Sequence, residues 1–197
     1  MAGRPSNRDE RYAQVMQALV RCVARFGLEG ASLSQVATEA GLSRPLIRHH
    51  LGNREEMISA LQDYVLQSFT EQTAALTAAL PAKEPSAALV ELLFSETTGA
   101  TPDLVLAFAA LTARAAEDTD LRAACRESLL RFEATIAETL RKEHPEADAY
   151  VVHATAHNIT ALYFNVTSLA PLEMPEEWVQ TARTLSRNLL KEMEKKT

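Results

Sequence analysis

The residues of this chain with the most distinctive chemistry are two arginines and two histidines within a stretch of seven residues. Arg44, Arg48, His49 and His50 lie between two glycines, and no acidic residue interrupts the stretch. Guanidinium and imidazole groups donate hydrogen bonds to phosphate oxygens, and arginine also pairs with the O6 and N7 atoms of guanine. This composition predicts a surface that approaches nucleic-acid phosphates and base edges.

A second pair of chemically capable residues is His153 and His157, which are four positions apart and share one face of a helix. Such a pair can bind one metal ion, but no glutamate follows His153, so the metalloprotease motif is absent. We interpret both as satisfied histidines of an interface or a pocket, with no metal. The alternative is a helical-bundle enzyme or metal-binding protein that uses this pair, which elemental analysis would reveal. We find no phosphate loop, nucleophile elbow or paired catalytic carboxylates, so no catalytic residue and no cofactor are expected.

Local capping signals indicate which elements position the basic stretch. Ser32 and Gln35 have the spacing of a capping box, and Gly41 suits the left-handed residue that ends a helix. Ser43 is predicted to cap a second helix, with Pro45 in its first turn. Two short helices joined by a glycine-containing turn predict a helix-turn-helix.

The start of a longer helix follows, where Asn53 and Glu56 form a third cap of the same kind. Arg54 is predicted to bind a phosphate there, aided by the dipole of that helix. Residues 1–56 hold eight basic and six acidic side chains, whereas the other 141 residues hold twelve and twenty. A basic head on an acidic body is typical of a protein that reads DNA with one end.

These motifs together resemble the tetracycline-repressor (TetR) family of bacterial transcription regulators. The resemblance is carried by Phe26-Gly27, by S-L-S-Q-V-A-T-E-A-G-L-S at 32–43 and by N-R-E-E-M at 53–57. Two recognition-helix positions depart from the family pattern: Arg48 replaces the usual Tyr and Leu51 the usual Phe. The resemblance implies a ligand-responsive repressor that binds a palindromic operator as a homodimer and is released by a small-molecule effector.

The expected organisation is a DNA-binding domain at 1–53 and a ligand-binding and dimerisation domain at 54–197. Arg44, at the N-terminal end of the recognition helix, is predicted to make the main base contact. The full set of predicted DNA-binding residues is Ser32, Ser34, Ser43, Arg44, Pro45, Leu46, Arg48, His49, His50 and Arg54.

Helical periodicity continues to the C-terminus, so an all-α fold of about nine helices is predicted. A helix expected at 146–169 has no charged residue after Asp148, which predicts burial on all sides, between the bundle core and a second subunit. Met193, which lies on the apolar stripe of the last helix, is expected in the interface with the second subunit. The predicted interface residues are His153, His157, Phe164, Trp178, Leu185 and Leu189.

An effector pocket would be lined by aromatic and weakly polar groups among Ala and Leu. Arg114 and Arg126 are expected to pair with the neighbouring Glu117 and Glu127 rather than with a ligand. The candidate pocket residues are Tyr64, Phe69, Phe94, Phe108, Thr112, Cys125, Phe132 and Asn158.

Composition sets the remaining limits. The chain has 197 residues, 47% of them hydrophobic, and a formal net charge of −6. Neither a signal peptide nor a membrane-spanning stretch is expected. Cys22 and Cys125 fall on apolar helical stripes, so buried thiols are expected rather than a disulfide, in a cytoplasmic protein.

Overall fold

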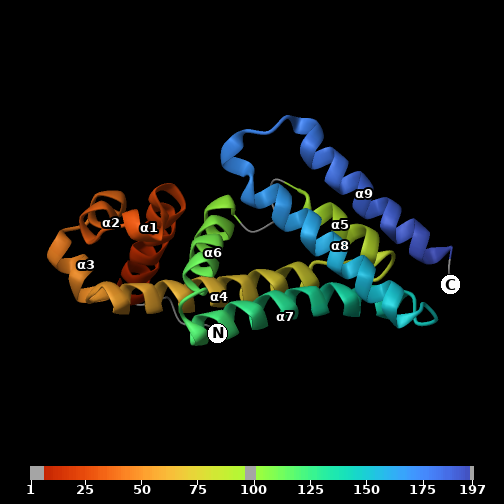
Figure 1. The fold of residues 1–197 in the computed structure, drawn as a ribbon, viewed down its shortest axis with the longest axis horizontal. Helices are drawn as coiled ribbons and strands as arrows, with labels where there is room; N and C mark the ends of the chain where they lie inside the picture. Colours follow the sequence, from red (N-terminus) through yellow and green to blue (C-terminus); the bar gives the residue numbers. More distant parts are fainter. Residues whose placement is uncertain (1–6, 96–100, 196–197) are drawn as a thin grey trace. The chain divides into compact units, whose positions relative to one another are not determined.

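The computed structural model describes residues 7–95 and 101–195, and within these ranges the chain is all-α, as predicted. No strand occurs in the described ranges, and no helix there combines the length and apolar character that crossing a membrane requires. The helices, coloured along the chain in Figure 1, are α1 (Asn7–Gly30), α2 (Leu33–Ala40), α3 (Arg44–Leu51), α4 (Arg54–Ala78), α5 (Pro85–Leu93), α6 (Pro102–Arg114), α7 (Thr119–Glu143), α8 (Ala149–Ser168), the short 3₁₀ turn η1 (Ala170–Leu172) and α9 (Glu176–Glu194).

The helices form two compact units. The first unit contains Met1–Ser68 and Asp103–Cys125, and the second contains Phe69–Pro102 and Arg126–Thr197. The first unit therefore includes the beginnings of α4 and α7 and nearly all of α6 in addition to the three N-terminal helices. The functional boundary between residues 53 and 54 stays a prediction.

In the first unit, α1 packs against α2 and α3 through an apolar stripe that includes Val15, Leu19 and Val23, all at most 1% exposed. Polar bonds fix the register between α1 and α2. Gln14 Nε2 donates to the Ala40 carbonyl at 2.7 Å, and Arg21 Nε donates to a Glu39 carboxylate oxygen at 2.5 Å.

Helix α1 contains one break. Gly27 has φ 71° and ψ 171°, after which a short helical segment continues to Gly30. Only glycine adopts such a positive φ without steric cost, so the break falls at Phe26-Gly27, one of the motifs that carry the family resemblance.

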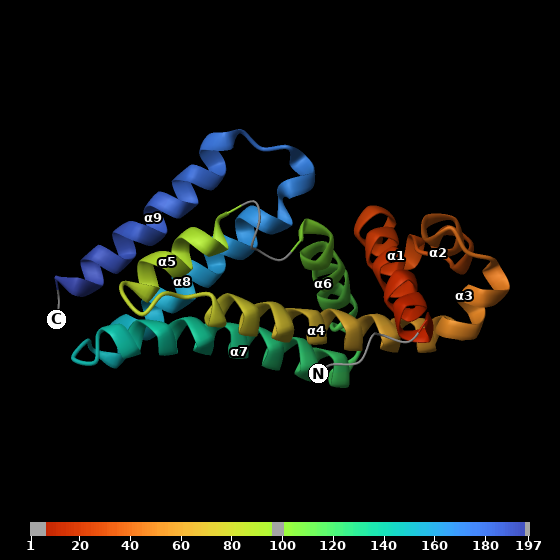
Figure 2. The ribbon, with the colours of Figure 1, turned by 180° about the vertical axis from the view of Figure 1, so that it is seen from behind.

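In the second unit, α9 packs against α5 and α8 (Figure 2) around a core that includes Leu89, Ile136, Val152 and Ile159.

The two cysteines belong to the first unit. The buried thiols of Cys22 and Cys125 are both free, as predicted. Burial raises the pKa of each thiol.

Helix α8 differs from its prediction at its start. The prediction placed the start at Glu146, but Asp148 is the cap: its Oδ1 accepts the backbone N–H of Tyr150 at 2.9 Å and of Val151 at 3.2 Å. One face of α8 is exposed in the single protomer, where Tyr150 is 80% exposed and His153 and His157 are exposed too. The predicted burial of that face against a second subunit stays a prediction.

Candidate nucleic-acid interface

Helix α2 is closed at both ends as its sequence predicts. Ser32 Oγ accepts the backbone N–H of Gln35 at 3.3 Å, and the Gln35 side chain accepts that of Ser32 at 2.9 Å. Gly41 adopts the left-handed conformation at the other end. Ser32 and Ser34 are exposed beside this capped end, so both predicted contact residues lie at the surface.

Helix α3 divides cleanly into an inner and an outer face. Ile47 and Leu51 are at most 1% exposed and anchor it, while Leu46 and His50 are half-buried. Its outer face presents the exposed residues Ser43, Arg44, Pro45, Arg48 and His49.

Ser43 does not cap α3 with its side chain, contrary to the prediction. A cap hydroxyl accepts from the second or third backbone N–H of the helix, and Pro45 occupies the second position with no N–H to donate. That leaves only the N–H of Leu46 at the third position, and the Ser43 hydroxyl does not accept it.

Helix α3 carries basic side chains and has no acidic residue to pair with them. Arg44 and Arg48 are exposed one turn apart, and no Asp or Glu occurs between Arg44 and Leu51. The His50 ring lies 5.6 Å from the His49 ring and 6.4 Å from the Tyr12 ring. Burial, then His49 and Arg8, lower the pKa of His50, so its neutral form is favoured.

The junction between α3 and α4 is fixed by a reciprocal cap. Asn53 donates its backbone N–H to Glu56 Oε2 at 2.7 Å, and Glu56 donates its own to Asn53 Oδ1 at 3.0 Å. The chain enters this cap through Gly52, with φ 65° and ψ −135°. The predicted third cap is therefore confirmed.

The guanidinium of Arg54 is bonded to the protein itself, whereas the prediction requires it to bind a phosphate. One of its terminal nitrogens donates to the Ala31 carbonyl at 2.6 Å and the other donates to the Leu28 carbonyl. The second nitrogen also lies 3.4 Å from a Glu29 carboxylate oxygen. These protein partners argue against the predicted phosphate contact, because both ends of the guanidinium are already engaged.

The next residue makes another long-range contact. Glu55 accepts from Arg114 at 2.8 Å and so connects the first turn of α4 to the end of α6. The prediction that Arg114 pairs with Glu117 is therefore wrong. The expected pairing of Glu127 with Arg126 was also wrong, since Glu127 pairs with Arg131.

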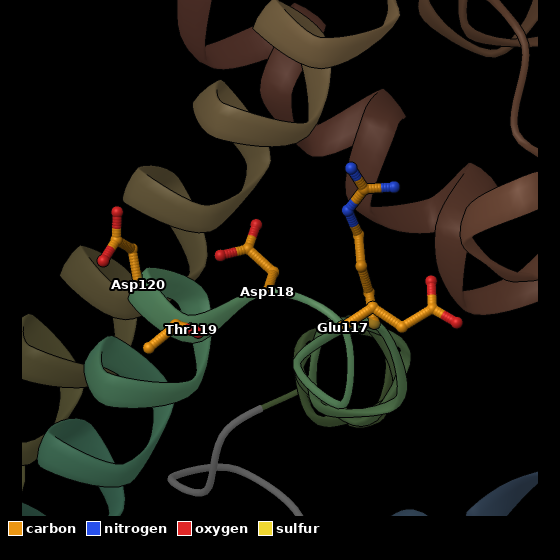
Figure 3. A pocket seen from close by; sticks show the side chains of 5 residues that line it. Glu117, Asp118, Thr119 and Asp120 are labelled. Carbon is orange, nitrogen blue, oxygen red and sulfur yellow. The ribbon is translucent and has the colours of Figure 1, made fainter.

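The turn between α6 and α7 borders an open hollow of about 370 Å³. Asp118 and Asp120 point to one side of this turn, whereas Glu117 points away from them (Figure 3). Asp118 also accepts the backbone N–H of Leu121 at 3.0 Å, which caps α7. The residues lining the hollow are Arg114, Glu117, Asp118, Thr119 and Asp120, none of which was a predicted pocket residue.

The candidate pocket residues are divided between the two units. Tyr64, Phe108, Thr112 and Cys125 belong to the first unit, and Phe69, Phe94, Phe132 and Asn158 belong to the second.

Two of these candidates, Thr112 and Asn158, are exposed, and their side chains donate to carbonyls of their own helices at 2.8 and 2.7 Å. Phe94 and Phe132 both pack against Tyr163, with ring centroids 6.4 and 5.7 Å apart. Tyr163 is not among the predicted pocket residues. The pocket itself stays a prediction.

Most predicted interface residues are available on the surface of the protomer. Trp178 is 39% exposed and Leu185 is 46% exposed, while Leu189 is half-buried. Phe164 is half-buried and packs on Phe132. Met193, by contrast, is 1% exposed within the core of the second unit, which corrects its expected place in the interface.

The two histidines of α8 have separate neighbours. His157 Nδ1 lies 3.0 Å from a Glu133 carboxylate oxygen, and His153 Nε2 lies 3.4 Å from an Arg141 nitrogen. Over residues 7–95 and 101–195, no three His, Cys, Asp or Glu side chains are grouped so that they could hold a metal ion.

Residues 15–61 match the family described as "Bacterial regulatory proteins, tetR family". The HTH-type transcriptional regulator BetI of Burkholderia thailandensis is 31% identical over 67 residues, which is 34% of either chain. The regulator of the same name from Burkholderia mallei is 26% identical over 145 residues, covering 72% of this chain and 73% of its own.

Solved structures share the fold over nearly the whole chain. A transcriptional regulator from Saccharomonospora viridis, crystallised with choline, has a TM-score of 0.70 at 20% identity and covers 93% of this chain and 96% of its own. A TetR transcription regulator from Haloarcula marismortui has a TM-score of 0.68 at 16% identity, with coverages of 94% and 98%. The family match falls on the very residues that build the capped helix pair and its cationic face, so in this part the chain is similar to the DNA-binding transcriptional regulators of the TetR family.

Proposed function

We propose that this regulator reads a palindromic operator by inserting α3 into the major groove. The observation that carries the proposal is the outer face of α3, where Arg44, Arg48 and His49 are exposed with no acidic residue on the helix. Arg44 lies in the first turn, the part of a recognition helix that meets base edges, and its fork fits guanine O6 and N7.

The neighbouring residues have supporting roles. Arg48 reaches a phosphate by charge, and Ser32, Ser34 and Ser43 lie at exposed helix starts where hydroxyl groups contact the backbone of the duplex. Pro45, Leu46 and His50 form the rest of the surface that α3 presents to the duplex, and they contribute to it through their shape and packing. Arg54 has no place in this contact set.

A homodimer would present two such helices. The support is the apolar surface that α8, η1 and α9 leave exposed, including Tyr150, Leu172, Trp178 and Leu185. An isolated protomer rarely leaves so many large apolar side chains in water, and a twofold partner would cover them. Two α3 helices about one helical turn of DNA apart would then read matching half-sites.

A small-molecule effector in the helical body would release the operator and relieve repression in the cytoplasm. The aromatic groups of the second unit, such as Phe94 and Phe132, are suited to bind an apolar or cationic ligand. Choline is a reasonable first compound to assay, because the structurally similar regulator from Saccharomonospora viridis was crystallised with it.

The experiment is a binding-site selection from a random duplex library, repeated with Arg44→Ala. The wild-type protein should select a palindrome, and Arg44→Ala should relax one position in each half-site, at a cost of about 1–3 kcal/mol in discrimination. Arg126→Ala, which removes an exposed arginine of α7, is the matched control and should select the wild-type sequence.

Two results would contradict this proposal. If the wild-type protein selected no sequence above background, operator recognition would be refuted. If Arg44→Ala selected an unchanged palindrome, the base contact would belong to His49 or Arg48 instead.

A further inference from the structure

Arg54 differs from Arg44 and Arg48 in the predicted DNA-binding set, because its terminal nitrogens are bonded to backbone carbonyls of the protein. Its two terminal nitrogens donate to the carbonyls of Leu28 and Ala31, and the separations along the chain are 26 and 23 residues. Both acceptor residues are buried, at 7% and 1% exposure. We propose that Arg54 is a positioning residue, which fixes the helix-turn-helix on α4 instead of binding a phosphate.

The acceptors lie where the chain enters the helix-turn-helix. The break at Gly27 ends the regular part of α1, and the four residues that follow lead directly to the Ser32 cap of α2. Holding the carbonyls of Leu28 and Ala31 therefore holds the start of α2.

The exit from the helix-turn-helix is held by the same turn of α4. Asn53 and Glu56 cap this turn directly after α3 ends, while Arg54 reaches back to the segment before α2 begins. Residues 33–51 are thus fixed at both ends by four consecutive residues, so a change in this turn would alter how α3 is presented.

The geometry requires an arginine rather than any cation. A guanidinium presents parallel donors in a rigid fork, which spans two separate carbonyls, whereas an ammonium is a single point charge. A phosphate contact, by contrast, would accept lysine with little loss. Arg54→Lys therefore separates a positioning role from a phosphate-binding role.

The inference rests on the proposed operator recognition, so the experiment measures both. Wild type, Arg54→Lys and Arg54→Ala are titrated with the selected palindromic duplex and with a random-sequence duplex from 50 to 300 mM salt. Hydrogen exchange of the amides at 28–31 is followed on the same free proteins, below their unfolding temperatures. Glu29→Gln is the matched control, because it removes only the ion pair of an exposed carboxylate and leaves both carbonyl bonds.

For a positioning residue, both Arg54 variants lose about tenfold in affinity for the palindrome, while affinity for the random duplex stays within about twofold. The slope of log affinity against log salt stays unchanged, because no phosphate contact is lost. The amides at 28–31 exchange about tenfold faster in both variants, and Glu29→Gln behaves as wild type.

Three results would overturn the inference: wild-type affinity for the palindrome in Arg54→Lys, equal losses on both duplexes with a slope reduced by about 0.9 in Arg54→Ala, or unchanged exchange at 28–31. If the wild-type protein failed to distinguish the two duplexes, the proposed operator recognition would fail. The exchange rates in Arg54→Lys would then still decide whether Arg54 holds this segment.

Discussion

Replacing Gly52 by Ala would place a methyl group where the carboxylate of Glu56 now lies. A Cβ atom at Gly52 would be 2.0 Å from Glu56 Oε2 and 2.7 Å from its Cδ. The Glu56 side chain is flexible enough to move away, but it would then lose its 2.7 Å bond from the backbone N–H of Asn53. The substitution therefore attacks the cap that joins α3 to α4.

The cost has two parts. The backbone of Gly52, at φ 65° and ψ −135°, lies in a region essentially limited to glycine, and an alanine there costs about 1–3 kcal/mol. Losing the cap bond adds about 1 kcal/mol. We expect Gly52→Ala to lower the free energy of unfolding by about 2–4 kcal/mol, and to weaken operator binding because α3 leaves its position.

Gly41→Ala is the matched control, measured by urea unfolding alongside Gly52→Ala. Gly41 has φ 63° and ψ 32°, with nothing within 4 Å of the place that an alanine methyl group would occupy, so it carries only the left-handed penalty of about 1–2 kcal/mol. Repeating Gly52→Ala in a Glu56→Ala background isolates the clash, because no carboxylate then remains to be displaced.

This prediction would be refuted if Gly52→Ala lowered the free energy of unfolding no more than Gly41→Ala does. It would also be refuted if the cost of Gly52→Ala were the same with and without Glu56, since the contact with that carboxylate would then contribute nothing.

Two further predictions concern pH and assembly. Folding lowers the pKa of His50 below its ordinary 6.5. As the pH falls through 6.5, the unfolded chain therefore binds more protons at this residue than the folded chain does. The free energy of unfolding should decrease as a result. Urea unfolding at pH 7.5 and 5.5 should show a smaller decrease for His50→Gln, and an identical decrease would contradict this. Leu185→Asp should convert a dimer of 21.6 kDa chains to monomers in sedimentation, because it charges a 46% exposed apolar side chain. Thr184→Asp, which adds the same charge about 100° around the helix, should stay dimeric; equal dissociation of both variants would remove Leu185 from the interface.

The parts of the site that sequence predicted correctly are those whose partners are close along the chain. The capping boxes of Ser32 and Asn53 each join residues three apart, so residue types and spacing define them. The left-handed Gly41 follows from the same local chemistry. The predicted side-chain cap by Ser43 is wrong, and Pro45 removes one of the two N–H groups that its hydroxyl could bind.

The parts that sequence could not supply depend on distant partners. Arg54 reaches carbonyls 23 and 26 residues away, and Arg114 pairs with Glu55 across 59 residues. Backbone carbonyls have no sequence signature, and a surface carboxylate is one of many candidates. For Arg54, its place at a helix start suggested an anion site, whereas tertiary packing turned it toward the protein.

The division of α3 into an inner and an outer face has an evolutionary consequence. Ile47 and Leu51 alone are buried, so the anchoring of the helix depends on few positions. Substitutions at exposed sites such as Arg44, Arg48 and His49 typically change stability by no more than about 0.5 kcal/mol. A duplicated gene copy could therefore acquire a new operator preference by mutation of these exposed residues while its product still folded, and a laboratory library restricted to the same positions would sample new specificities at little risk of unfolding.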